Sequence, residues 1–397
     1  MRERRILPQL PALARRIDAA TPAGRDRTVD ALRALAVLGV VLGHWLVTAL
    51  VADTGTVHGA SPLAAIPQLA PISWMFQTLA VFFLVGGYVA AQGYAAARAR
   101  GTRYRDWAAA RMLRLFRPVA ALLLTWVCVC AAMLAAGVRV DTVTTLLKLV
   151  LSPLWFLLVF AALTAATPLV TRLHPLWPLA VVLHVDLIRF GLDGPETLGL
   201  LNIGAGWLVP YCLGALWARG GFHPRSAGLV LLPCGALAAA ALVLFAGYPA
   251  SMVGVPGAAV SNLNPPTLAA VCFGLAQCGA ALLLLEPLRR VLRRPLLWAG
   301  VALLNLSVMT VFLWHQTAMM AVTALGLLAG RPLPGLHTAP EGPGWVLARI
   351  GWLPVFACAL LVCWAAYRTY EQRSGGGSTG RVVQQGAPGR KPVDDHA

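Results

Sequence analysis

The chain of 397 residues is 58% hydrophobic and only 12% charged, with a mean hydropathy of +0.72. A soluble protein of this length needs a far more polar surface, so the composition argues against a soluble enzyme and indicates a protein with many membrane-spanning segments. The formal net charge of +17 would suggest nucleic-acid binding in a soluble protein. In a membrane protein the basic residues must first be assigned to the two sides of the bilayer.

A basic segment, residues 1–28, opens the chain, and it has neither the apolar core nor the cleavage site of a signal peptide. Ten apolar runs long enough to cross a bilayer follow it, two of them short or amphipathic and one long enough to be broken. They predict an all-α integral membrane protein with about ten transmembrane helices in one domain, 29–372, and then a disordered cytoplasmic tail, 373–397. The runs are 31–51, 72–92, 117–137, 145–170, 175–190, 200–218, 227–248, 266–286, 298–328 and 349–369.

Lysine and arginine are distributed unevenly between the segments that connect these runs. With the N-terminus inside the cell, the inner segments hold 26 of the 32 basic residues and the outer segments hold 5, while Arg33 lies within the first run. This asymmetry predicts a multi-pass protein of the cell membrane with both termini cytoplasmic. It also explains most of the net charge without a nucleic-acid partner.

The first run carries two residues that are costly inside a bilayer, Arg33 and His44. They are eleven residues apart, which in an α-helix is three turns with a drift of about 20°, so both lie on one face, roughly 16 Å apart. Arg33 would lie near the cytoplasmic mouth, and His44 past the middle of the span, where an imidazole could act as a general base. The alternative is structural, with Arg33 snorkelling to the interface and His44 bonded to a neighbouring helix.

The most basic inner segment, residues 98–118, lies between the second and third runs. Arg111 and Arg114 are three residues apart on a predicted helix and share a face, and Arg117 follows three residues later. Arginine forks bind phosphate oxygens bidentately, which suits a phosphorylated ligand. Contact with anionic lipid headgroups explains the same charges equally well.

Two further polar features lie in the later runs. Asp186 and Arg189, near the outer end of the fifth run, can form a solvated ion pair on one helix face or line a site for an acceptor. His315, in the ninth run, can contact a substrate, support His44, or make an interhelical hydrogen bond with a neighbouring polar group such as Gln316. All eight cysteines lie in or near apolar runs without a CxxC pair, so we expect no metal site.

Several segments, in order along the chain, are similar to motifs of the acyltransferase 3 family, the bacterial membrane O-acyltransferases. A further pair, VDLIRFGL (185–192) and LNIGAGWLVPYCLGALW (201–217), resembles the middle helices of a mainly actinobacterial branch. The segments of this chain that resemble motifs of the family as a whole are VDALRALAVLGVVLGHW (29–45), VFFLVGGYVAAQGY (81–94), RMLRLFRP (111–118), PLWFLLVFAALTAATPL (153–169) and LSVMTVFLWHQTAM (306–319).

This resemblance implies a ten-helix fold and transfer of an acyl group, often acetyl, from cytoplasmic acyl-CoA to a hydroxyl of a carbohydrate or other metabolite, in many members outside the cytoplasm. It implies His44 as the catalytic residue and Arg33 as its paired residue on the donor side. The phosphates of the coenzyme are then expected at Arg111, Arg114 and Arg117. The candidates for contact with substrate are His315, Asp186, Arg189, Tyr88 and Trp155.

Two positions depart from the family pattern. Gly86 stands where the family has a serine, and Phe160 stands where some members have a glutamate, so the resemblance assigns no acidic partner to His44. Two other functions use the same polar residues. One is a transporter or flippase with Arg33 and His44 as its substrate or proton site, and the other is a sensor that has lost turnover.

Overall fold

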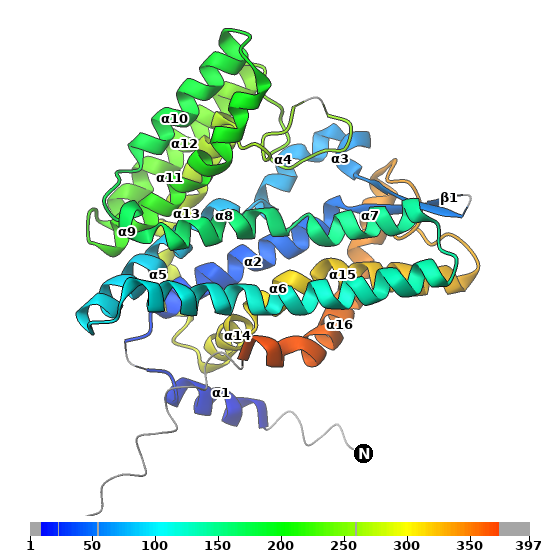
Figure 1. Cartoon of the computed structure of the whole chain (residues 1–397), viewed down its shortest axis with the longest axis horizontal. Coiled ribbons are helices and arrows are strands. Elements are labelled where there is room, and N and C mark those ends of the chain that lie inside the picture. Colours follow the sequence, from blue (N-terminus) through cyan, green and yellow to red (C-terminus); the bar gives the residue numbers. More distant parts are fainter. Residues whose placement is uncertain (1–8, 23, 54, 259, 373–397) are drawn as a thin grey trace, which may run out of the picture.

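The computed structural model describes residues 9–22, 24–53, 55–258 and 260–372. Over these ranges the chain is a bundle of helices with one two-stranded antiparallel hairpin, β1 Ala49–Asp53 and β2 Thr56–Ala60 (Figure 1). Nine helical segments of the described chain are long and apolar enough to cross a membrane, which confirms the predicted all-α integral membrane class. The tail, 373–397, lies outside the described residues, and the domain boundary at 28/29 stays a prediction.

The predicted runs correspond to helices in the same order along the chain. The fifth run forms only an 11-residue helix, α10, continued by a five-residue π turn, Leu187–Gly191, and this helix is not among the nine segments long enough to cross a membrane. The ninth run is broken at Ser307, as its length suggested. The helices are α1 Gln9–Ala19, α2 Arg27–Val47, α3 Pro62–Ala65, α4 Ala70–Ser73, α5 Leu79–Ala99, α6 Tyr104–Ala135, α7 Val140–Leu151, α8 Leu154–Ala165, α9 Thr167–Val170, α10 Leu176–Asp186, α11 Leu200–Ala218, α12 Pro224–Phe245, α13 Leu268–Val291, α14 Pro295–Leu306, α15 Val308–Gly326 and α16 Pro343–Gln372.

Helix α6 begins much earlier than the apolar run that predicted it. The run starts at residue 117, whereas the helix has 32 residues, starts at Tyr104 and continues through Pro118. The apolar run marks the part of a helix that lipid surrounds, and it does not mark where the helix begins. Four arginines of the basic segment, Arg105, Arg111, Arg114 and Arg117, therefore lie on the first turns of a long helix.

Close helix packing depends on small residues. A Cβ atom at Gly87 of α5 would meet the backbone of Tyr211 in α11, and a Cβ at Gly214 of α11 would meet the backbone of Leu84 in α5. The two glycines therefore let α5 and α11 pack backbone to backbone, which is typical of helices in a bilayer.

The bundle has two ends that differ in character. At one end the turn between α5 and α6 carries the basic segment, and we call this the basic end. The β1–β2 hairpin marks the opposite end, which we call the hairpin end (Figure 1). Helix α1 packs against α14, and Trp298 Nε1 donates a hydrogen bond of 2.7 Å to Thr21 Oγ1 beside it. The excess of positive charge predicts that the basic end faces the cytoplasm.

Candidate active site

His44 lies in the last turn of α2 and lines a cavity of about 510 Å³ near the hairpin end. The walls come from α2, the hairpin, the segment before α5, the α7–α8 junction, the loop before α13, and α15. The apolar and glycine part of the lining includes Gly43, Phe76, Leu79, Trp155 and Phe156. Trp155, one of the predicted substrate-contacting residues, is therefore in the same cavity as His44.

The polar groups of this cavity are almost all uncharged. No Asp, Glu, Lys or Arg side chain is among the described residues that line it, so His44 is its one readily ionisable group there. The other polar side chains are hydroxyls and amides, which hydrogen-bond to neutral polar ligands. They are Thr48, Ser61, Ser73, Gln77, Ser152, Ser261, Asn264 and Gln316.

The side chain of Gln316, on α15, meets His44 directly. Gln316 Nε2 lies 3.1 Å from His44 Nδ1, a hydrogen bond between residues 272 positions apart. The sequence offered Gln316 only as a neighbour for His315. The one signal in the sequence was that Gln316 is a second polar residue, next to a histidine, in an apolar run. Polar residues inside membrane-spanning segments usually have a functional role.

His315 lies beside His44 but not in the cavity wall. The two rings are 5.1 Å apart between centroids, and the His315 side chain is fully buried, with Nδ1 bonded to the backbone oxygen of Phe312. Its backbone oxygen accepts a 2.9 Å hydrogen bond from Trp45 Nε1 of α2. His315 therefore joins α15 to the last turns of α2, next to the candidate catalytic histidine.

A buried arginine, Arg349, holds the end of α2 that carries His44. It is 1% exposed, and its guanidinium donates to the backbone oxygens of Trp45 (2.6 Å), Thr48 (2.6 Å) and Gly335 (2.9 Å). The last carbonyl groups of a helix lack partners within the helix, and a cation there is favourable. The charge count along the sequence had treated Arg349 as an outer loop residue, whereas α16 carries it into the interior.

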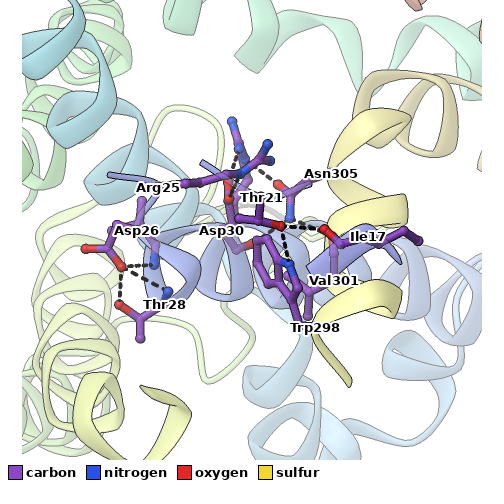
Figure 2. A network of polar contacts seen from close by, with 11 residues as sticks. Ile17, Thr21, Arg25, Asp26, Thr28, Asp30, Trp298, Val301 and Asn305 are labelled. Atoms are coloured by element: carbon purple, nitrogen blue, oxygen red, sulfur yellow. Dashed lines mark hydrogen bonds and ion pairs between the residues drawn. The ribbon is translucent and has the colours of Figure 1, made fainter. Parts of the chain in front are cut away.

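Arg33 lies at the other end of α2, in a polar network. Its Nε donates to Asn305 Oδ1 at 2.7 Å, and its NH2 group pairs with Asp30 at 2.6 Å. Figure 2 shows Asp30 at the centre of this network, with Arg25 paired to it and Asn305 at the end of α14 beside it. Arg33 is thus fixed toward the basic end and does not line the cavity of His44.

A second cavity, of about 330 Å³, lies at the basic end between α5 and α6. Arg111 and Arg114 line it together, as their spacing predicted, whereas Arg117 is exposed and lies outside it. Arg100 also lines it. The remaining lining residues are Gly93, Ala96, Ala97, Thr102, Asp106, Trp107 and Ala110.

Asp186 and Arg189 form an ion pair of 3.7 Å, but the expectation that solvent surrounds it is wrong. Asp186 is 1% exposed and accepts hydrogen bonds from Asn202 Nδ2 (2.9 Å), Tyr248 OH (3.1 Å) and the backbone N–H of Leu268 (2.6 Å). Burial and, as a smaller effect, the negative charge of Asp186 raise the pKa of the Tyr248 hydroxyl. The hydroxyl therefore stays protonated and donates to Asp186. This network joins α10, α11 and α13, and the pair does not line the cavity of His44.

Tyr88 also lies away from that cavity, with its ring 4.1 Å from the ring of Trp217 between centroids. In the described part of the chain no group of three or more His, Cys, Asp or Glu side chains could hold a metal ion, and the cysteines are free.

A family model for an acyltransferase domain matches residues 26–368, nearly the whole chain. The chain belongs to the acyltransferase 3 family. It is therefore a membrane acyltransferase. Comparisons with curated proteins and with solved structures found no match.

Phe82 and Phe83 of α5 lie between the residues of that helix that line the two cavities of this acyltransferase. Leu79 lines the cavity of His44, and Gly93 lines the arginine cavity on the same helix, which places them about 21 Å apart along α5. Ring centroids are 4.9 Å apart for Phe82 and Phe160, and 4.9 Å apart for Phe156 and Phe312. We call this set the aromatic layer, and it consists of Phe82, Phe83, Phe156, Phe160 and Phe312.

Proposed function

We propose that this membrane acyltransferase moves an acyl group, such as acetyl, from acyl-CoA to a hydroxyl of a carbohydrate or another small metabolite. The observation that carries the proposal is the position of His44, in the wall of an uncharged cavity and hydrogen-bonded to Gln316. A neutral cavity rich in hydroxyl and amide groups suits an uncharged, hydroxyl-bearing acceptor. No metal is required in this scheme.

The donor binds at the basic end. Arg111 and Arg114 line a cavity there and are suited to the phosphates of coenzyme A. The separation of about 21 Å along α5 favours a donor with a long, thin arm that carries the reactive thioester away from its charged head. Acyl-CoA has this shape. With the basic end in the cytoplasm, the acceptor enters from the opposite face of the cell membrane.

His44 acts as general base in the first of two possible routes. The acceptor hydroxyl loses its proton to Nε2 of His44 while its oxygen attacks the thioester carbonyl; the C–S bond then breaks, and the thiolate of coenzyme A takes up the proton. In the second route Nε2 of His44 attacks the thioester carbonyl and the C–S bond breaks, and the departing thiolate of coenzyme A takes up the proton from Nδ1. The acceptor hydroxyl then attacks the acyl group, the N–C bond breaks, and the hydroxyl proton goes to the imidazole. Rapid-quench labelling without acceptor distinguishes them, because only the second route leaves acyl label on the enzyme.

Gln316 prepares the imidazole for this task. Its Oε1 atom has no hydrogen-bond partner among the described residues, while its amide nitrogen faces Nδ1 of His44. A half-turn of the amide exchanges these two atoms, so that Oε1 accepts a hydrogen bond from Nδ1. With the proton on Nδ1, the lone pair of Nε2 is free to take a proton from the acceptor.

The test is consumption of acetyl-CoA by the purified protein, with the release of free coenzyme A as readout. We expect His44→Ala to abolish acceptor-dependent release and His58→Ala, an exposed histidine of the hairpin, to leave it unchanged. Arg111→Ala should raise the KM for acetyl-CoA at least about tenfold, because a charge-assisted hydrogen bond is lost, whereas Arg117→Ala should change it little. Equal turnover by the His44→Ala variant would rule out its catalytic role, and a protein that binds no donor would instead favour transport.

A further inference from the structure

A buried indole at the basic end has a hydrogen-bond donor without a partner. Trp107, on the first turns of α6, is only 7% exposed, and its Nε1–H has no acceptor among the described residues. The ring is fixed by Tyr94, with centroids 5.3 Å apart, and by the guanidinium of Arg111, which lies 5.8 Å from the ring centroid. A buried donor left unpaired is costly, so a ligand that accepts from it is favoured.

The unpaired N–H points to the same small space as an arginine. Trp107, Arg111 and Gly93 all line the cavity of about 330 Å³ between α5 and α6. A Cβ atom at Gly93 would lie 3.8 Å from Nε1 of Trp107 and would collide with the guanidinium of Arg111. The two donors therefore converge beside Gly93, whose missing side chain makes room for the guanidinium of Arg111, and the adjoining cavity can take the atoms of a ligand.

The charge of this cavity selects the kind of ligand. Arg100, Arg111 and Arg114 line it, and none of them forms an ion pair within the described residues. The one acidic lining residue, Asp106, is paired with Arg103 at 3.0 Å. Several cations together with a neutral N–H donor are suited to a group with many acceptor oxygens and negative charge, which is the chemistry of a phosphate ester.

We propose that Gly93, Trp107 and Arg111 form a phosphate cradle in which the indole N–H of Trp107 donates to a phosphate oxygen of the acyl-CoA donor. The proposal rests on the proposed function, since it names a further residue of the donor site. Gly93 leaves room for the guanidinium of Arg111, Arg111 supplies the charge, and Trp107 supplies a directional donor that costs little to desolvate because it is neutral. The phosphate of a lipid headgroup has the same chemistry and is the competing occupant.

The experiment measures binding of coenzyme A to the purified full-length protein in bilayer discs of phosphatidylcholine. Trp107→Phe keeps an aromatic ring over Arg111 and removes only the N–H, and we expect it to weaken binding about tenfold, as for one hydrogen bond to a charged group. Trp177→Phe, which changes an exposed tryptophan, is the matched control and should bind like the parent. Thermal unfolding of each variant shows whether it is folded.

A second pair of variants tests the space over Gly93. Gly93→Ala should weaken coenzyme A binding about tenfold or more, because the added methyl group displaces the guanidinium of Arg111. Gly300→Ala, in α14, meets nothing within 4 Å and should bind like the parent. Equal affinity of the parent, Trp107→Phe and Gly93→Ala would overturn the cradle.

The failure of the cradle and the failure of the proposed function give different results. If the parent binds no coenzyme A, the proposed function fails. If the parent binds and Arg111→Ala weakens binding while Trp107→Phe and Gly93→Ala do not, only the cradle is wrong. If, in addition, Trp107→Phe retains less phosphatidylglycerol than the parent after purification from anionic membranes, the space holds a lipid phosphate and the cradle is not part of the donor site.

Discussion

The ring of Phe160, on α8, lies directly against the backbone of Gly86, on α5, in the space that a side chain at position 86 would occupy. These are the two positions at which the chain departs from the family pattern of serine and glutamate. The departures are therefore one structural change, in which a small residue on one helix accommodates a large ring from the next. The ring belongs to the aromatic layer, through contacts with Phe82 and Phe83.

This contact predicts that a smaller side chain at position 160 restores the stability lost when a side chain is added at position 86. Gly86→Ala should lower the stability by about 1–3 kcal/mol, because an added methyl group overpacks a filled site. Phe160→Leu should restore most of that loss in the double variant, since the shorter side chain leaves room. Unfolding midpoints of the four proteins in detergent give the coupling energy, and Gly204→Ala, which meets nothing within 4 Å on α11, is the control. Additive losses in the double variant would contradict the contact.

A second prediction concerns the hydrogen bond between Gln316 and His44. Gln316→Leu should lower kcat at least about tenfold with little change in the KM for acyl-CoA, because the imidazole loses the group that orients it. Gln316→Glu should retain much more activity, since a carboxylate can only accept from Nδ1. Steady-state kinetics of the two variants decide the matter. Equal loss in both would mean that Gln316 serves packing alone.

The hydrogen bonds from Arg349 to the last carbonyl groups of α2 should contribute strongly to the stability of the protein. In Arg349→Met three backbone oxygens lose their donors in a buried position, so we expect a loss of about 3 kcal/mol or more in stability. The stability of Arg349→Lys should lie between that of Arg349→Met and that of the parent, because one ammonium group cannot reach all three oxygens that the guanidinium contacts. Arg331→Met, at an exposed position, serves as the control for thermal unfolding in detergent. A parent-like midpoint for Arg349→Met would show that the carbonyls find other partners.

Asp186 should matter for stability and not for the acceptor. Asp186→Asn leaves Arg189 buried without a counter-charge, which should cost about 3 kcal/mol. The KM for the acceptor should stay the same in the folded fraction, because Asp186 does not line the cavity of His44. Asp193→Asn, at an exposed position of the following loop, should change neither quantity. A changed KM with unchanged stability would return Asp186 to the acceptor site.

Much of this fold was predictable from the sequence because lipid imposes simple rules. The apolar runs identified the helices in order, and the spacing of Arg111 and Arg114 predicted that they share one face of a helix. The spacing of Arg33 and His44 gave their separation along one helix. Each of these inferences uses only neighbours within a single helix.

The partners of these residues were not predictable in the same way. The bond between His44 and Gln316 joins α2 to α15, and the carbonyls that Arg349 contacts belong to the end of α2 and to a distant loop. Such pairs depend on how helices dock, and a polar residue in an apolar run has many possible partners at that stage. The burial of Asp186 depends likewise on α11 and α13 closing over it.

The aromatic layer bears on the electrical insulation of the membrane. Under the proposed function, donor and acceptor enter from opposite faces of the bilayer. The protein must then not become a pore for protons or metal cations, because a leak would discharge the voltage that the cell maintains. Packed phenyl rings exclude water and the ions that water carries. Removing two of these rings with Phe82→Ala and Phe156→Ala together should therefore cause ion leakage from protein-loaded vesicles.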